Sequence, residues 1–167
     1  VSKVDSFSSM FQGAVSFNGD LSGWDTSGAT IMSNMFRGAS EFSSDLGSWD
    51  VSNVEKMNGM FAHTKVNFDM SSWDTGKVTD MSQMFIGTDY FNGNLSTWDV
   101  SSVINMNAMF SGAAVFNQSL VLWNTSNVND MGYMFCGPSS FDQDISMLDV
   151  SSVTDMSAMF QHNYDYN

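Results

Sequence analysis

VSSVTDMSAMF, at Val150–Phe160, places two methionines and a phenylalanine at fixed points among small polar residues. Near-copies precede it at almost constant spacing, such as VSSVINMNAMF at residues 100–110 and TSNVNDMGYMF at residues 125–135. A repeat of this length indicates that each copy is one structural unit. The units are 1–25, 26–50, 51–74, 75–99, 100–124, 125–149 and the shorter 150–167. We expect one repeat domain over residues 1–167, as a piece of a longer chain.

The apolar residues of the repeat fall into columns, with one member in each unit. Three columns are Met35, Met60, Met84, Met109 and Met134; Phe36, Phe61, Phe85, Phe110 and Phe135; and Trp24, Trp49, Trp73, Trp98 and Trp123. A single unit of this size cannot bury its own apolar face, so neighbouring units must stack into a shared core. These columns are therefore predicted to form ladders that run through the core, with one rung per coil.

The spacing of apolar residues within a unit predicts the elements of each coil. In residues 103–113 they recur after three, three, one and three positions, which favours a short helix or 3-10 segment. The segment that follows the helical one in each unit, such as FNGNLSTWD at residues 91–99, predicts a short bent strand. The expected fold is an α/β repeat solenoid, with one short strand and one short helix or 3-10 segment in each of about seven coils.

Polar columns mark the ends of the predicted helix. One column, usually followed two residues later by serine, is Asp25, Asp50, Asp74, Asp99, Asn124 and Asp149. Such residues accept hydrogen bonds from backbone N–H groups at helix starts and turns. Glycine follows the predicted helix in most units, as at Gly112, and suits a backbone with positive φ. Stacked carboxylates could also bind calcium, but the neutral Asn124 favours hydrogen bonding, so no metal or cofactor is predicted.

The charge of the chain limits its partners. With 18 acidic and 5 basic residues, the formal net charge is −13, which argues against nucleic acid and anionic membrane as partners. His63 and His162 lie about four units apart, and Cys136 is the single cysteine. No catalytic triad, phosphate-binding loop or dinucleotide motif occurs, so we expect no enzyme activity.

The whole pattern, VSSVTDMSxMFxGAxxFNxxLSxWD, resembles the leucine-rich-repeat surface proteins of the BspA-like type, which occur in bacterial surface proteins and lipoproteins and in protists. The resemblance covers almost the entire chain. It implies a secreted or cell-surface scaffold that binds a protein or glycan in adhesion or recognition. The pattern is broken at residues 62–66, where one residue is missing, and in the sixth unit, where Pro138 occurs and Leu148 replaces tryptophan.

Function in a repeat protein is expected where exposed positions differ between units. Two columns of small polar residues become apolar at Val121, Leu122 and Met147, which predicts a partner-binding patch. Alternatively, these residues repack around Leu148. End-to-end self-assembly through the edges of the stack is an alternative function, and ice binding through rows of small polar residues is a lesser one. Glycosylation at the sequons of Asn94, Asn117 and Asn124 stays open.

Overall fold

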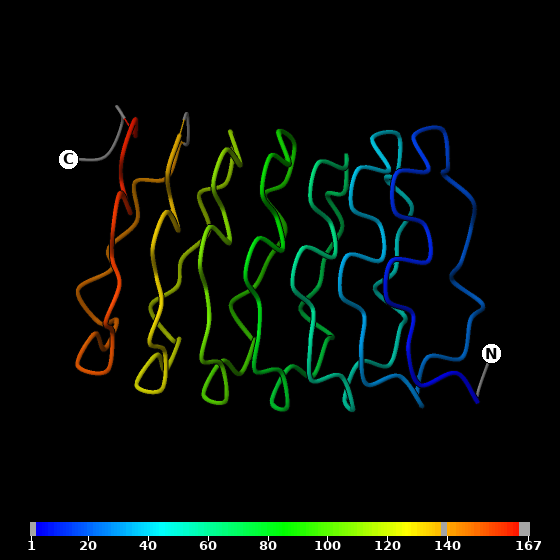
Figure 1. The fold of residues 1–167 in the computed structure, drawn as a ribbon, viewed down its shortest axis with the longest axis horizontal. Helices are drawn as coiled ribbons and strands as arrows, with labels where there is room; N and C mark the ends of the chain where they lie inside the picture. The colour runs from blue at the N-terminus through cyan, green and yellow to red at the C-terminus, as the bar shows by residue number, and fades with distance from the viewer. Residues whose placement is uncertain (1–2, 138–139, 164–167) are drawn as a thin grey trace.

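The computed structural model describes residues 3–137 and 140–163 as a stack of coils. Figure 1 shows the coils side by side along the long axis, from the N-terminus at one end to the C-terminus at the other. Consecutive coils are joined by isolated parallel bridges at one residue per repeat: Ser6, Ile31, Lys56, Asp80, Asn105, Asp130 and Asp155. Each sequence repeat therefore forms one coil, and equivalent residues lie next to one another in neighbouring coils.

The predicted α/β solenoid, with a strand and a helix or 3-10 segment in each coil, is wrong. The described part of the chain contains bridges, turns and bends, but no helix and no strand longer than a single bridge residue. The bridges also lie in the segment predicted to be helical, rather than in the one predicted to be a strand. The leucine-rich-repeat geometry expected from the resemblance is therefore absent from these residues.

The direction of the backbone N–H groups explains why no helix forms. In the first coil, alternate N–H groups at Phe7, Ser9, Phe11 and Gly13 donate to carbonyls of the next coil over 2.8–2.9 Å. Between them, turns close within the coil, as where the N–H of Met10 donates to the Phe7 carbonyl over 3.2 Å. An α-helix would direct each of these N–H groups to a carbonyl four residues back in its own segment. The coil instead uses half of them to bind its neighbour.

Two positions in each coil have positive φ, which is the signature of this chain of turns. The glycine column has φ of 63° to 105°, as expected, although no helix precedes it. The second column has φ of 52° to 63° and consists of Ser9, Asn34, Gly59, Gln83, Ala108, Tyr133 and Ala158. Type II turns require positive φ at their third residue, which Ser9 supplies in the turn 7–10 and Gly13 in the turn 11–14. These turns, with the turn 9–12 between them, produce the apolar spacing that resembles a helix.

The apolar columns form the core of the stack. The side chains of the predicted Met, Phe and Trp ladders are buried, except that Trp24 in the first coil is half-buried. The ring of Phe110 stacks on those of Phe85 and Phe135 at centroid distances of 5.7 and 5.8 Å. It also stacks on Phe116, from a second phenylalanine column, at 3.9 Å. Aromatic rings thus pack both along the stack and across each coil.

A tryptophan side chain in each of the second to fifth coils forms a hydrogen bond to the coil before it. The indole Nε1–H of Trp98 donates to the buried backbone carbonyl of Met70 over 3.0 Å, and Trp49, Trp73 and Trp123 make the equivalent bond. Leu148 occupies this slot in the sixth coil, and its side chain has no N–H to donate. Each of these carbonyls also accepts a backbone N–H in its own coil, as that of Met70 does from Trp73 over 3.1 Å, so the indole supplies a second donor.

The shortened third coil replaces one aromatic contact with another. Val66 stands where other coils carry the second phenylalanine, and Phe68 enters the core from two residues later. The ring of Phe68 meets Phe61 edge-on at 6.0 Å and 87°. The missing residue is therefore accommodated by local repacking. Pro138, the corresponding departure in the sixth coil, lies outside the described residues.

Candidate functional site

The carboxylate columns hold the turns of each coil. The Oδ1 atoms of Asp25, Asp50, Asp74, Asp99, Asn124 and Asp149 each accept the N–H of the residue two positions later, over 2.9–3.2 Å. Asp20, Asp45, Asp69, Asn94 and Asp144 do the same in a parallel column. Both columns form Asx-turns, not helix caps. Because asparagine serves equally in both, hydrogen-bond acceptance explains these positions without a bound cation.

No cluster of metal-ligating side chains is formed by these columns. Within residues 3–137 and 140–163, no three His, Cys, Asp or Glu side chains lie close enough together to hold a metal ion. His63 and His162 both occupy the glycine column, with φ of 58° and 62°, and both are exposed. Cys136 is half-buried and carries a free thiol. The aspartates and Asn124 that the sequence predicts as hydrogen-bond acceptors therefore lie in turns that shape the coil.

Acid is expected to destabilise the stack through these aspartates. The Ser52 hydroxyl, and then its N–H, hold the pKa of Asp50 below its ordinary value of 3.8; Ser101 acts likewise on Asp99. Because the folded-state pKa is lower than the unfolded one, this stabilisation is present above about pH 4 and is lost as pH falls through the folded pKa. Thermal unfolding between pH 7 and 2 should show Tm falling below about pH 4.

The matched variant for this prediction is Asp50→Asn with Asp99→Asn, which keeps the acceptor oxygens, as Asn124 does naturally. Its Tm should fall less between pH 4 and pH 2 than that of the unaltered chain. An equal fall in both proteins would show that other groups cause the acid sensitivity.

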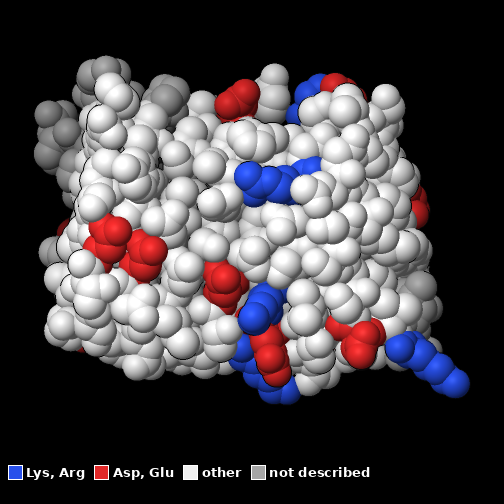
Figure 2. Space-filling model, viewed as in Figure 1, with Lys and Arg blue, Asp and Glu red and all other residues white. Residues whose placement is uncertain are grey.

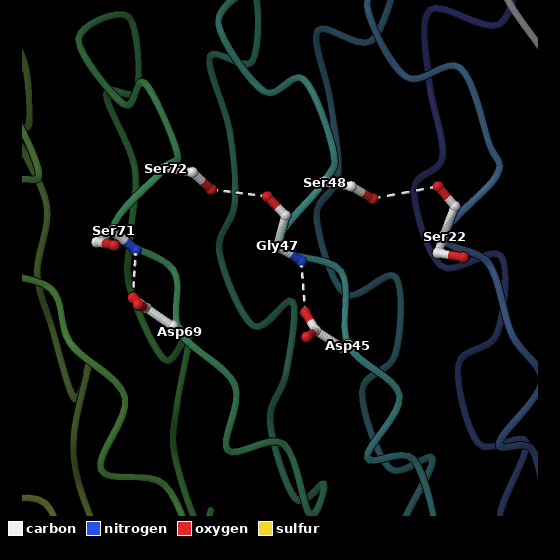
Figure 3. Close-up of a pocket in the computed structure, with 7 residues that line it drawn as sticks. All are labelled: Ser22, Asp45, Gly47, Ser48, Asp69, Ser71 and Ser72. Atoms are coloured by element: carbon white, nitrogen blue, oxygen red, sulfur yellow. Dashed lines mark hydrogen bonds between the residues drawn. The ribbon is translucent and has the colours of Figure 1, made fainter.

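A shallow polar hollow lies on the face formed by the second Asx column. It has a volume of about 400 Å³ and is lined by Ser22, Asp45, Gly47, Ser48, Asp69, Ser71 and Ser72. Figure 3 shows that its polar atoms bind one another: the Ser48 hydroxyl donates to the Ser22 carbonyl over 3.1 Å and the Ser72 hydroxyl to the Gly47 carbonyl over 2.7 Å. The rows of small polar residues therefore tie neighbouring coils together.

The predicted partner-binding patch continues the same columns into the fifth and sixth coils. Val121, Leu122 and Met147 are 47%, 76% and 65% exposed. Leu122 and Met147 occupy the column in which Ser48, Ser72 and Thr97 donate to the previous coil, so they cannot make that bond. The structure thus places these three apolar side chains in solvent, and at two of the positions, Leu122 and Met147, a hydroxyl could bond to the previous coil.

Repacking around Leu148 does not account for Leu122. The fifth coil, to which Leu122 belongs, retains a buried Trp123 that donates to the Leu95 carbonyl over 3.2 Å. Only Met147 shares a coil with Leu148. The local irregularity in the sixth coil can therefore explain at most one of the two long apolar side chains.

The three sequon asparagines hold hydrogen bonds through their side-chain oxygens. Asn94 and Asn124 accept from Ser96 and Ser126 in Asx-turns. Asn117 accepts the N–H of Asp142 in the next coil over 3.0 Å. Their glycosylation stays a prediction.

Charged side chains do not gather into a basic patch on the face drawn in Figure 2, where the few Lys and Arg side chains are scattered among acidic and uncharged ones. One salt bridge joins Lys65 Nζ to the Glu41 carboxylate, over 2.8 and 2.9 Å to its two oxygens. This pair adjoins a second hollow, of about 290 Å³, lined by Ser40, His63, Thr64, Lys65, Gly87, Asp89 and Tyr90. Sequence reasoning missed this hollow, although the column that contains Glu41, Lys65 and Tyr90 differs in nearly every unit.

Comparison with known proteins identifies the repeat. No helix in the described ranges is long and apolar enough to cross a membrane. No curated protein and no solved structure matches the chain. A family model described as "Mycoplasma protein of unknown function, DUF285" matches residues 1–68 and 62–167. Since these two matches together span the entire sequence, the chain belongs to this family of repeat proteins.

Proposed function

We propose that the chain is a non-catalytic scaffold for adhesion or recognition, secreted or held at a cell surface, and that Val121, Leu122 and Met147 contact its partner. The partner is a protein or a glycan. The observation that carries the proposal is the exposure of three apolar side chains in columns that elsewhere hold small, mostly polar residues. Contiguous exposed apolar side chains on a protein surface are typical of interaction sites.

The energetic argument favours a contact role over a structural one. A serine at position 122 or 147 could donate to the preceding coil, as Ser48 and Ser72 do, and such a bond contributes about 0.5–1.5 kcal/mol. Leucine and methionine give up that bond and bury little of their own surface. A partner that covers these two side chains would bury their apolar surface and offset the lost hydrogen bonds. The resemblance of the repeat to BspA-like surface proteins supports the same class of function.

The test restores the repeat pattern at the patch. The variant Val121→Ser, Leu122→Ser, Met147→Ser should fold with equal or slightly higher stability, because the new hydroxyls can join the inter-coil bonds. Beads that carry the chain would be tested for adhesion to cultured cells and to surfaces coated with extracellular-matrix proteins. Loss of apolar contact side chains is expected to weaken adhesion by about tenfold or more.

A control removes exposed apolar side chains elsewhere in the fifth coil. Ile104→Ser with Val115→Ser alters two apolar residues that are 46% and 43% exposed and should leave adhesion unchanged. Sedimentation velocity of the same samples tests whether the patch instead binds a second copy of the chain. Equal adhesion by the patch variant and the unaltered chain would exclude the patch as the contact.

A further inference from the structure

One column along an edge of the stack carries residues of different chemical type in three consecutive coils. The column before the second phenylalanine reads Ser16, Glu41, Lys65, Tyr90, Val115 and Ser140. It changes from acid to base to aromatic between the second and fourth coils. The third coil also carries His63 where most coils have glycine. Variation at neighbouring exposed positions of a repeat scaffold is where binding specificity is expected.

These departures converge on the hollow of about 290 Å³ near His63, Lys65, Asp89 and Tyr90. Its size is just below the range of about 300–1,000 Å³ that is usual for small-molecule sites. The Tyr90 side chain is 59% exposed. Gly87 leaves the room that the imidazole of His63 occupies, because a Cβ at Gly87 would overlap His63 Nδ1. The hollow therefore depends on both the histidine and the glycine beside it.

The polar groups of this hollow are arranged differently from those of the serine-lined one. The side chains of His63, Asp89 and Tyr90 make no hydrogen bond to another described residue. Lys65 Nζ donates to both Glu41 oxygens, which fixes the ammonium group and leaves it one further donor. The hollow thus presents a fixed cationic donor, an imidazole, a carboxylate and the open face of an aromatic ring.

This combination selects a class of ligand. The ring of Tyr90 offers a rigid surface for an apolar face, while Asp89, His63 and Lys65 can accept from and donate to hydroxyl groups. Glu41 and Asp89 outweigh Lys65 in charge, so an anionic ligand is disfavoured. A pyranose ring has an apolar C–H face and a rim of hydroxyls. We propose that the hollow formed by His63, Lys65, Asp89 and Tyr90 binds a neutral saccharide.

The site goes beyond the proposed function, since it shares no residue with the patch of Val121, Leu122 and Met147, and each can fail without the other. The test titrates the chain with methyl glycosides of glucose, galactose, mannose and N-acetylglucosamine, their β-linked dimers, and glucuronic acid. Saturation-transfer NMR reports contact, and calorimetry gives affinity. At least one neutral saccharide should bind, with Kd on the order of 1 mM for so shallow a site, and more tightly than glucuronic acid.

Two variants locate the site without disturbing the core. Tyr90→Ala should weaken binding by about tenfold or more, and His63→Gly, which restores the repeat, by about twofold to tenfold through a lost hydrogen bond. Val115→Ala and His162→Gly, at equivalent positions outside the hollow, should leave affinity unchanged. The assignment is overturned if no neutral saccharide binds at about ten millimolar, if glucuronic acid binds more tightly, or if Tyr90→Ala retains full affinity.

Discussion

Phe110→Ala is expected to lower the free energy of unfolding by about 3–5 kcal/mol, the usual cost of removing a fully buried phenylalanine ring. The ring is completely buried and stacks on Phe85 and Phe135 in the flanking coils and on Phe116 in its own. Stacked aromatic pairs add about 0.5–1.5 kcal/mol each beyond the area they bury. Removal of one rung therefore weakens both inter-coil interfaces of the fifth coil.

Urea unfolding followed by tryptophan fluorescence measures this loss. Val115→Ala, at an exposed position of the same coil, is the matched control and should change stability by no more than about 0.5 kcal/mol. Because each coil packs mainly against its neighbours, the variant should also unfold less cooperatively, with a smaller m-value. A loss below about 1 kcal/mol for Phe110→Ala would contradict the view that the aromatic ladder holds the coils together.

The repeat and its columns could be predicted from the sequence, but the local backbone could not. A spacing of three, three, one and three is shared by an amphipathic helix and by a series of overlapping turns. What separates them is the direction of alternate N–H groups, such as those of Phe7 and Ser9, which donate to the next coil. That choice depends on a partner about 25 residues away, so a pattern within one unit cannot reveal it.

The valine and threonine residues that alternate at the start of the units differ in the hydrogen bonds they make in the folded chain. The hydroxyls of Thr26, Thr75 and Thr125 are buried and each donates over 2.9 Å to a carbonyl at the end of the same unit. Val51 and Val100 fill the same slot with a methyl group in place of the hydroxyl and are equally buried. From the sequence alone, the alternation carries no such information.

The candidate sites were predictable to different degrees. Val121, Leu122 and Met147 depart from polar columns that alignment of the units makes visible, and the exposure of each follows from its column. The second hollow combines His63, Lys65 and Tyr90 from two coils, at a place where one residue is missing. The column of Glu41, Lys65 and Tyr90 was the available signal, but only the stacked coils show that its variable residues surround one space.

Trp98→Leu is expected to cost about 2–4 kcal/mol, because it removes both ring volume and a buried hydrogen bond. Trp98 stacks on Trp73 at 6.2 Å and 5° and donates to the Met70 carbonyl over 3.0 Å. Met70 is fully buried, and its carbonyl also accepts the Trp73 N–H over 3.1 Å, so loss of the indole removes only the second donor, at about 0.5–1.5 kcal/mol. Chemical denaturation of Trp98→Leu beside Trp98→Phe, which keeps an aromatic ring but no N–H, separates the two contributions.

Leu148 lies in the same column and allows the opposite substitution, from leucine to tryptophan. It is nearly buried, at 9% exposure, so the sixth coil tolerates leucine in the slot that Trp98 fills in the fourth. Leu148→Trp should therefore raise stability by about 1 kcal/mol, if the indole reaches the Leu120 carbonyl as the other tryptophans reach theirs. Equal stability of Trp98→Phe and the unaltered chain would assign the role of the column to ring packing alone. A loss in Trp98→Phe close to that in Trp98→Leu would assign it to the features that only the indole has, its N–H and its second ring.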